Sequence, residues 1–192
     1  MTKAGVATIV SGLPRSGTSL MMQMLAAGGL PALTDGQRRA DVSNPKGYYE
    51  LEAVKRTRED SSWLERADGH CVKMISMLLY DLPPDRQYKI LFMTRAIEEV
   101  LASQSAMLKD RKESQGPDDG TMRRHYETHL RKLEPWLKSQ ANMSVLYCSY
   151  NALVRNPREE AGRVLAFLAL PLDVERMTAS VDPELYRQRK RT

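Results

Sequence analysis

The residue types best placed to do chemistry lie near the start of the chain, in the stretch Ser11–Ser19, whose sequence is SGLPRSGTS. This stretch joins a short apolar run, Val6–Val10, to a run compatible with a helix, Leu20–Ala27. A glycine-containing turn from a buried strand into a helix directs several backbone N–H groups at one point, where an anion can bind. The sequence therefore predicts an anion-binding loop formed by Pro14, Arg15, Ser16, Gly17, Thr18 and Ser19.

The glycine spacing in this loop matches the Walker A motif, but the phosphate-binding lysine of that motif is missing. Gly12 is followed after four residues by Gly17, and Thr18 stands where the motif has Lys, while a cation, Arg15, lies within the loop. A kinase or NTPase also needs a Mg²⁺-binding acid at the end of another strand, where this chain has Arg95. The pattern favours transfer of an anion without a metal. A Mg²⁺-dependent P-loop kinase of a small molecule stays as an alternative.

Three segments resemble the sulfotransferases that use 3′-phosphoadenosine 5′-phosphosulfate (PAPS). Residues 11–19 resemble that family's 5′-phosphosulfate loop, and Ile90–Arg95 followed by Ser103 is similar to its 3′-phosphate motif. A third segment, Val145–Leu170, resembles the family's late strand and the helices after it. The resemblance implies PAPS as the sulfuryl donor, adenosine 3′,5′-bisphosphate as the product and no metal. It also implies that the loop holds the 5′-phosphosulfate, and that Arg95 and Ser103 hold the 3′-phosphate.

The catalytic base is the point at which this chain departs from the family. Many of these sulfotransferases carry a catalytic His two residues after a Lys in the second strand, whereas Lys73 is followed here by Ile75. His70 lies on the wrong side of the strand start to replace that His. We predict that Glu50 accepts the acceptor's proton, because a similar loop with two aromatics before a Glu lies near the acceptor site in bacterial relatives. The alternative is that Glu50 only begins a helix over Leu51–Asp60 and complements its dipole.

Apolar runs predict the strands of a parallel sheet, and periodic segments between them predict helices. The strands are expected at Val6–Val10, Cys71–Ile75, Tyr88–Thr94 and Ser144–Ser149. Helices are expected at Leu20–Ala27, after Arg95, at Met122–Gln140 and at Arg158–Leu168, with a loop at Asp110–Gly120 and a turn at Val154–Pro157. The expected fold is α/β, a P-loop-type parallel sheet of four or five strands with helices on both faces. Ligands of such sheets lie outside the carboxyl ends of the strands, so the loop and Arg95 should face one site.

Length and composition indicate one domain over residues 1–192, with 42% apolar and 28% charged residues. No signal peptide or membrane span is evident, so we expect a cytoplasmic protein without a membrane partner. The net charge is +5 and the end of the chain, Arg187–Arg191, is basic, but no nucleic-acid-binding signature accompanies it. A small polyanionic ligand explains this excess without a nucleic acid. Cys71 and Cys148 lie in apolar runs and are expected to be buried and reduced.

These observations favour in-line transfer of a sulfuryl group from PAPS to a hydroxyl or amine of a small-molecule or carbohydrate acceptor. Arg15 and the N–H groups of the loop would stabilise the charge that builds on the departing phosphate, and Lys73 is placed to contact the same group. A non-catalytic nucleotide-binding protein that has lost its base is a second alternative. His125 and His129 have the spacing of metal ligands but no third ligand nearby, so no metal site is predicted.

Overall fold

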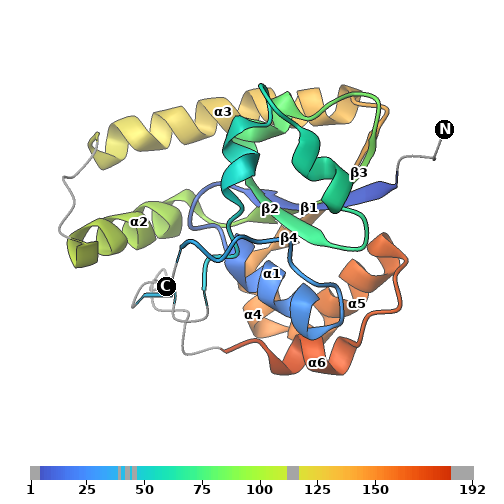
Figure 1. Cartoon of the computed structure of the whole chain (residues 1–192). Coiled ribbons are helices and arrows are strands. Elements are labelled where there is room, and N and C mark those ends of the chain that lie inside the picture. Colours follow the sequence, from blue (N-terminus) through green and yellow to red (C-terminus); the bar gives the residue numbers. More distant parts are fainter. Residues whose placement is uncertain (1–4, 39, 42–43, 45–46, 112–116, 183–192) are drawn as a thin grey trace.

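Four parallel strands form the sheet at the centre of the fold (Figure 1). The computed structural model of the protein describes residues 5–38, 40–41, 44, 47–111 and 117–182. The strands are β1 (Val6–Gly12), β2 (Cys71–Ile75), β3 (Gln87–Thr94) and β4 (Met143–Ser149), in the spatial order β2-β1-β3-β4. The predicted α/β fold with a parallel sheet is confirmed, with four strands in the described part of the chain.

Helices cover both faces of this sheet (Figure 1). One face carries α1 (Thr18–Ala27), α4 (Tyr150–Arg155), α5 (Pro157–Leu168) and α6 (Val174–Ala179). The other face carries α3 (Asp119–Ser139) and three short 3₁₀ helices, η1 (Glu52–Arg56), η2 (Ser62–Arg66) and η3 (Ser76–Asp81). The remaining helix, α2 (Ile97–Arg111), follows β3 and packs against α3 through a third, smaller apolar cluster.

The alternation of side chains along β2 decides which residues reach the site. Val72 and Met74 pack into the core beneath α3, and Cys71 packs into the core beneath α1. Because successive side chains of a strand point to opposite faces, Lys73 and Ile75 lie on the α1 side. The carboxyl end of β2 therefore directs Lys73 toward the first turn of α1.

Two glycines follow the end of α1. The helix ends at Ala27, and Gly29 takes the left-handed conformation, with φ of 103°. The N–H of Gly29 donates to the carbonyl of Ala26, and the N–H of Leu30 donates to that of Leu25. Glycine is favoured here because it adopts a positive φ without steric cost.

The largest difference from the expected elements is the segment after Glu50. Instead of an α-helix over residues 51–60, only the 3₁₀ turn η1 forms. Both the N–H and the hydroxyl of Thr57 donate to the carbonyl of Val54, the hydroxyl at 2.6 Å, and the Trp63 indole donates to that hydroxyl. Side-chain bonds of this kind compete with the α-helical pattern. The predicted helix is therefore wrong, and Glu50 is not the start of one.

Two connections are shorter than expected. The turn predicted at Val154–Pro157 is reduced to Asn156, because α4 continues to Arg155. The loop predicted at 110–120 loses its ends to α2 and α3, and its residues 112–116 lie outside the described residues. None of the helices in the described part of the chain combines the length and apolarity that a membrane span requires.

Candidate functional site

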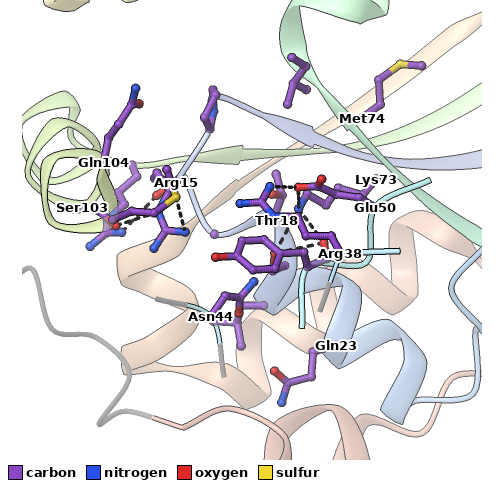
Figure 2. A pocket seen from close by; sticks show the side chains of 18 of the residues that line it. Arg15, Thr18, Gln23, Arg38, Asn44, Glu50, Lys73, Met74, Ser103 and Gln104 are labelled. Carbon is purple, nitrogen blue, oxygen red and sulfur yellow. Dashed lines mark hydrogen bonds and ion pairs between the residues drawn. The ribbon is translucent and has the colours of Figure 1, made fainter. Parts of the chain in front are cut away.

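A cavity of about 710 Å³ opens at the carboxyl edge of the sheet, between the anion-binding loop, β2 and α2. All but one of the predicted site residues line it: Pro14, Arg15, Gly17, Thr18, Ser19, Glu50, Lys73, Arg95 and Ser103. The exception is Ser16, which is buried and borders a second cavity of about 360 Å³. Figure 2 shows two groups of side chains in the main cavity, Arg15 with Ser103 on one side and Lys73 with Glu50 on the other.

The anion-binding loop holds a backbone conformation that two glycines make possible. Gly12 and Gly17 have φ of 150° and 101°. A Cβ on Gly12 would lie 2.6 Å from the carbonyl oxygen of Met93, and a Cβ on Gly17 would collide with the ring of Tyr150. Real side chains do not fit at such distances. The glycine spacing seen in the sequence therefore corresponds to two close approaches of the loop to its neighbours.

The start of α1 has the features of an anion site. No side chain caps this helix, and its first turn contains no acidic residue, so its own residues leave the positive end of the dipole uncompensated. Next to it, the Ser16 hydroxyl is buried and lacks a hydrogen-bond partner among the described residues. Buried hydroxyls in native proteins are usually satisfied, and this one borders the second cavity rather than the main one. The loop and the helix start together suit a bound phosphate or sulfate group.

Lys73 is a buried cation beside the first turn of α1. Its Nζ donates to the carbonyl of Tyr48 at 2.6 Å and to the hydroxyl of Ser19 at 3.3 Å, and it lies 3.5 Å from Oε1 of Glu50. Burial lowers the pKa of Lys73 to about 8, although attraction to Glu50 acts in the opposite direction. A cation that is costly to bury, placed beside an anion-binding loop, is consistent with a functional role.

The cost of burying the charge of Lys73 predicts a measurable dependence of stability on pH. The pKa of Lys73 is about 8 in the folded protein against 10.5 for an ordinary lysine, so the unfolded chain binds more protons between these values. The contribution of Lys73 to the free energy of unfolding should therefore rise with pH over this window, by up to about 3 kcal/mol. Below pH 8 the penalty for burying the charge is fully present.

Urea unfolding of the wild type and of Lys73→Met at several pH values would measure this effect. The stability difference between the two proteins should change steadily from pH 8 to 10.5. Lys138→Met is the matched control, because Lys138 is an exposed lysine paired with Glu134 on α3. A difference for Lys73→Met that stays constant across this range would show that Lys73 is not a destabilising buried cation.

Glu50 lies in the cavity rather than at a helix start. Its Oε1 accepts a hydrogen bond from Arg38 at 2.6 Å and faces Lys73 at 3.5 Å. The side chain is 25% exposed, so a ligand in the cavity can reach it. Of the two sequence-based interpretations of Glu50, the structure therefore supports the cleft-lining one, while its role as a base stays a prediction.

Two residues that organise this corner were not predicted. The Tyr48 side chain is buried, its hydroxyl donates to the carboxylate of Asp41, and the guanidinium of Arg38 stacks 3.5 Å from the centre of its ring. Arg38 in turn holds Glu50. The two aromatics before Glu50 were a signal for Tyr48, but nothing in the local sequence identified Arg38. Pro45 and Lys46 of the predicted presentation loop lie outside the described residues.

Arg95 has more partners than the sequence indicated. Its Nε donates to Oε2 of Glu99 at 2.9 Å, and this ion pair is buried, with side-chain exposures of 6% and 4%. The guanidinium also donates to the carbonyl of Arg15 at 3.2 Å and stacks 4.4 Å from the ring centre of Tyr150. Glu99 lies in the first turn of α2, where it complements the helix dipole. Its carboxylate, one helical turn after Arg95, offsets the cost of burying the guanidinium.

The two predicted phosphate subsites are joined by a direct contact. Nε of Arg15 donates to the hydroxyl of Ser103 at 3.1 Å, although the two residues were assigned to opposite ends of the donor. Arg15 adopts a left-handed conformation, with φ of 67°, which few non-glycine residues do without a compensating role. Burial, the largest effect, lowers the pKa of Arg15; Tyr48 opposes this, and the nearby charge of Arg95 lowers the pKa to a smaller extent.

The histidines and cysteines lie away from the cavity lining. His70 precedes β2, at the amino edge of the sheet, and His129 lies 2.9 Å from the Ser76 hydroxyl, where burial lowers its pKa. Within the described ranges, no three potential metal-ligating His, Cys, Asp or Glu side chains come together. Cys71 and Cys148 are buried free thiols, as predicted, and burial raises the pKa of each to about 12. The basic segment Arg187–Arg191 lies outside the described residues.

Comparisons with known proteins agree on one family. The family model described as "Sulfotransferase domain" matches residues 7–190 of this chain. Among solved structures, the chain is similar to the sulfotransferase domain from the curacin biosynthetic pathway, with a TM-score of 0.57 and 14% sequence identity. The match covers 96% of this chain and 90% of that one, and it shows a shared fold. No match was found among curated proteins.

Proposed function

Because this chain belongs to the sulfotransferase domain family, we propose that it transfers a sulfuryl group from PAPS to a hydroxyl or amine of a small acceptor. One observation carries the proposal. An anion-binding loop without the Walker lysine shares a cavity with a buried cation, Lys73, and with a carboxylate, Glu50. Transfer of a sulfuryl group requires these three elements, namely a cradle for the anion, a cation for the developing charge and a base for the acceptor.

The donor would be held at its two phosphorylated ends. The anion-binding loop and the start of α1 would take the 5′ end, and Arg95 with Ser103 would take the 3′-phosphate. The uncapped start of α1, with no acidic residue in its first turn, supports the first assignment. When bound, PAPS supplies a sulfuryl group on a mixed anhydride and leaves as adenosine 3′,5′-bisphosphate.

Three side chains have distinct roles in this proposal. Glu50 takes the proton from the acceptor hydroxyl or amine, because its carboxylate is the member of the Lys73–Glu50 pair that can accept a proton. Lys73 and the backbone N–H groups of the loop stabilise the negative charge that grows on the departing phosphate. Arg15 adds a second cation and, through Ser103, connects the loop to α2.

The choice of nucleotide tests this function directly. Adenosine 3′,5′-bisphosphate should bind in the presence of EDTA and at least about tenfold more tightly than AMP, because a charge-assisted contact to a second phosphate contributes about 1.5–3 kcal/mol. Titration calorimetry with both nucleotides and with ATP would measure the difference. Equal affinity for AMP and the bisphosphate, or binding of ATP only with Mg²⁺, would overturn the proposal and favour the kinase alternative.

A variant of Arg95 tests whether this residue causes the preference for the bisphosphate over AMP. Arg95→Ala should remove the advantage of the bisphosphate and leave the affinity for AMP nearly unchanged. Since this change leaves the Glu99 carboxylate buried without its arginine, the double variant Arg95→Ala/Glu99→Ala serves as a second test in which both charges are gone. Arg123→Ala, which removes a surface ion pair with Glu98, is the control and should bind like the wild type.

A further inference from the structure

The cavity has a second region that the donor assignment leaves unused. Five apolar side chains that line it follow Glu50 or Lys73 closely in the chain, and we call them the apolar wall: Leu51, Val54, Met74, Ile75 and Leu78. In Figure 2, Met74 lies beyond Lys73 and Glu50, whereas Arg15, Ser103 and Gln104 lie at the opposite end. The wall therefore begins where the reacting groups of the proposed function stand.

The chain connectivity explains this placement. Leu51 directly follows Glu50, and Met74 directly follows Lys73, so each of the two charged residues has an apolar neighbour in the chain. Ile75 lies at the end of β2, beside Gly12 of β1, and Leu78 comes from the 3₁₀ helix η3 that follows. A molecule that places one group beside the Lys73–Glu50 pair would thus lay the rest of itself against the wall.

The residues of the wall differ in exposure. Leu51, Val54 and Met74 are buried, whereas Ile75, at the end of β2, is 38% exposed. A large apolar side chain that is exposed where it lines a cavity is one that a ligand can cover. A ligand in the cavity would therefore bury the side chain of Ile75.

Few polar side chains next to the apolar wall could form hydrogen bonds with a ligand. Ser76 is buried and its hydroxyl forms a hydrogen bond with the ring of His129, so this hydroxyl does not reach the cavity. Lys55 lines the rim, but its ammonium is paired with Glu52. A sugar placed here would bury several hydroxyls without hydrogen-bond partners, which is unfavourable for each of them. A hydrocarbon ring or chain would instead gain from covering the wall.

We infer that the acceptor is a small molecule with an apolar body that carries a single reacting hydroxyl, rather than a carbohydrate. The hydroxyl lies beside the Lys73–Glu50 pair, within reach of the Glu50 carboxylate, and the apolar body covers Ile75, Met74 and Leu78. This inference rests on the proposed function and narrows its acceptor to one of the classes left open by the sequence.

Binding measurements in the absence of turnover test the inference. With the enzyme saturated by adenosine 3′,5′-bisphosphate, calorimetry would compare 2-naphthol and n-octanol with methyl β-glucoside. The two apolar probes should bind at least about tenfold more tightly than the glucoside. Sulfation rates of the same three compounds with PAPS should follow the same order.

Variants locate the binding surface. Ile75→Ser should weaken the binding of 2-naphthol by about five- to tenfold and leave the affinity for the bisphosphate unchanged. Val6→Ser is the matched control, because Val6 is an exposed apolar residue at the opposite end of the neighbouring strand and should have no effect. Thermal unfolding of both variants would confirm that the fold is retained.

The possible outcomes distinguish a failure of the acceptor assignment from a failure of the proposed function. If the bisphosphate does not bind in EDTA, the proposed function fails and the acceptor assignment falls with it. If the bisphosphate binds but the glucoside binds as well as 2-naphthol, or Ile75→Ser behaves like Val6→Ser, only the assignment of an apolar acceptor is overturned.

Discussion

Replacing Glu50 with Gln should lower the rate of sulfuryl transfer by about 10²- to 10⁴-fold, because a positioned general base contributes rate enhancements of this size. The amide keeps the shape of the side chain and can still contact Arg38, but it cannot take the acceptor's proton. Affinity for adenosine 3′,5′-bisphosphate should stay within about threefold of the wild type, since Glu50 is not assigned to a phosphate. Steady-state rates with PAPS and calorimetry with the product nucleotide would provide both numbers.

Glu52→Gln is the matched control for this experiment. Glu52 lies two residues further along the chain, on the surface, where it pairs with Lys55. Its replacement should leave the rate unchanged. If Glu50→Gln retains full turnover while His70→Gln loses it, the base is His70, despite its position at the amino edge of the sheet. A large rise in KM with an unchanged kcat would instead show that Glu50 only positions Arg38 and Lys73.

Replacing Arg15 with Ala should lower the transfer rate by about 10²- to 10³-fold, the usual effect of removing one donor that stabilises charge in a transition state. The guanidinium is held by the Ser103 hydroxyl and by an unusual backbone conformation, so its position is set before a ligand arrives. Nucleotide affinity should fall by a smaller factor than the rate, because a ground-state contact is weaker than its counterpart in the transition state.

Two further variants make this prediction specific. Arg15→Lys keeps a positive charge but loses the bond from Nε to Ser103, so we expect a rate between those of the wild type and Arg15→Ala. Ser103→Ala removes the same bond from the other side and should reduce the affinity for the bisphosphate more than for AMP. A rate for Arg15→Ala within about threefold of the wild type would show that Arg15 does not act on the departing group.

The local sequence was sufficient to predict the secondary-structure elements that position the site residues. The apolar runs of β1, β2, β3 and β4 indicated the strands to within one or two residues, because a buried parallel strand is apolar on both faces. The anion-binding loop was recognisable from Gly12 and Gly17, since each position demands a backbone without a side chain. The parallel sheet then implied that the loop and Arg95 share one edge.

The helix predicted after Glu50 shows where local reasoning stops. The propensities of residues 51–60 are compatible with an α-helix, yet the hydroxyl of Thr57 donates to the carbonyl of Val54 that would have continued it, and the indole of Trp63 donates to that hydroxyl. That choice depends on how Trp63 packs into the core beneath α3, which neighbouring residues do not encode. It also decides that Glu50 faces the cavity and not a helix axis.

The sequence by itself therefore determined which residues form the glycine-containing loop after β1, and it predicted that this loop and Arg95 lie at one edge of the sheet. The tertiary structure decided their partners: Lys73 with Glu50, Arg95 with Glu99, and Arg15 with Ser103. Of these pairs, only Arg95 and Glu99 are close enough along the chain to be anticipated from helical spacing. The other two join segments 23 and 88 residues apart, and their contact exists because parallel strands bring distant loops to one edge.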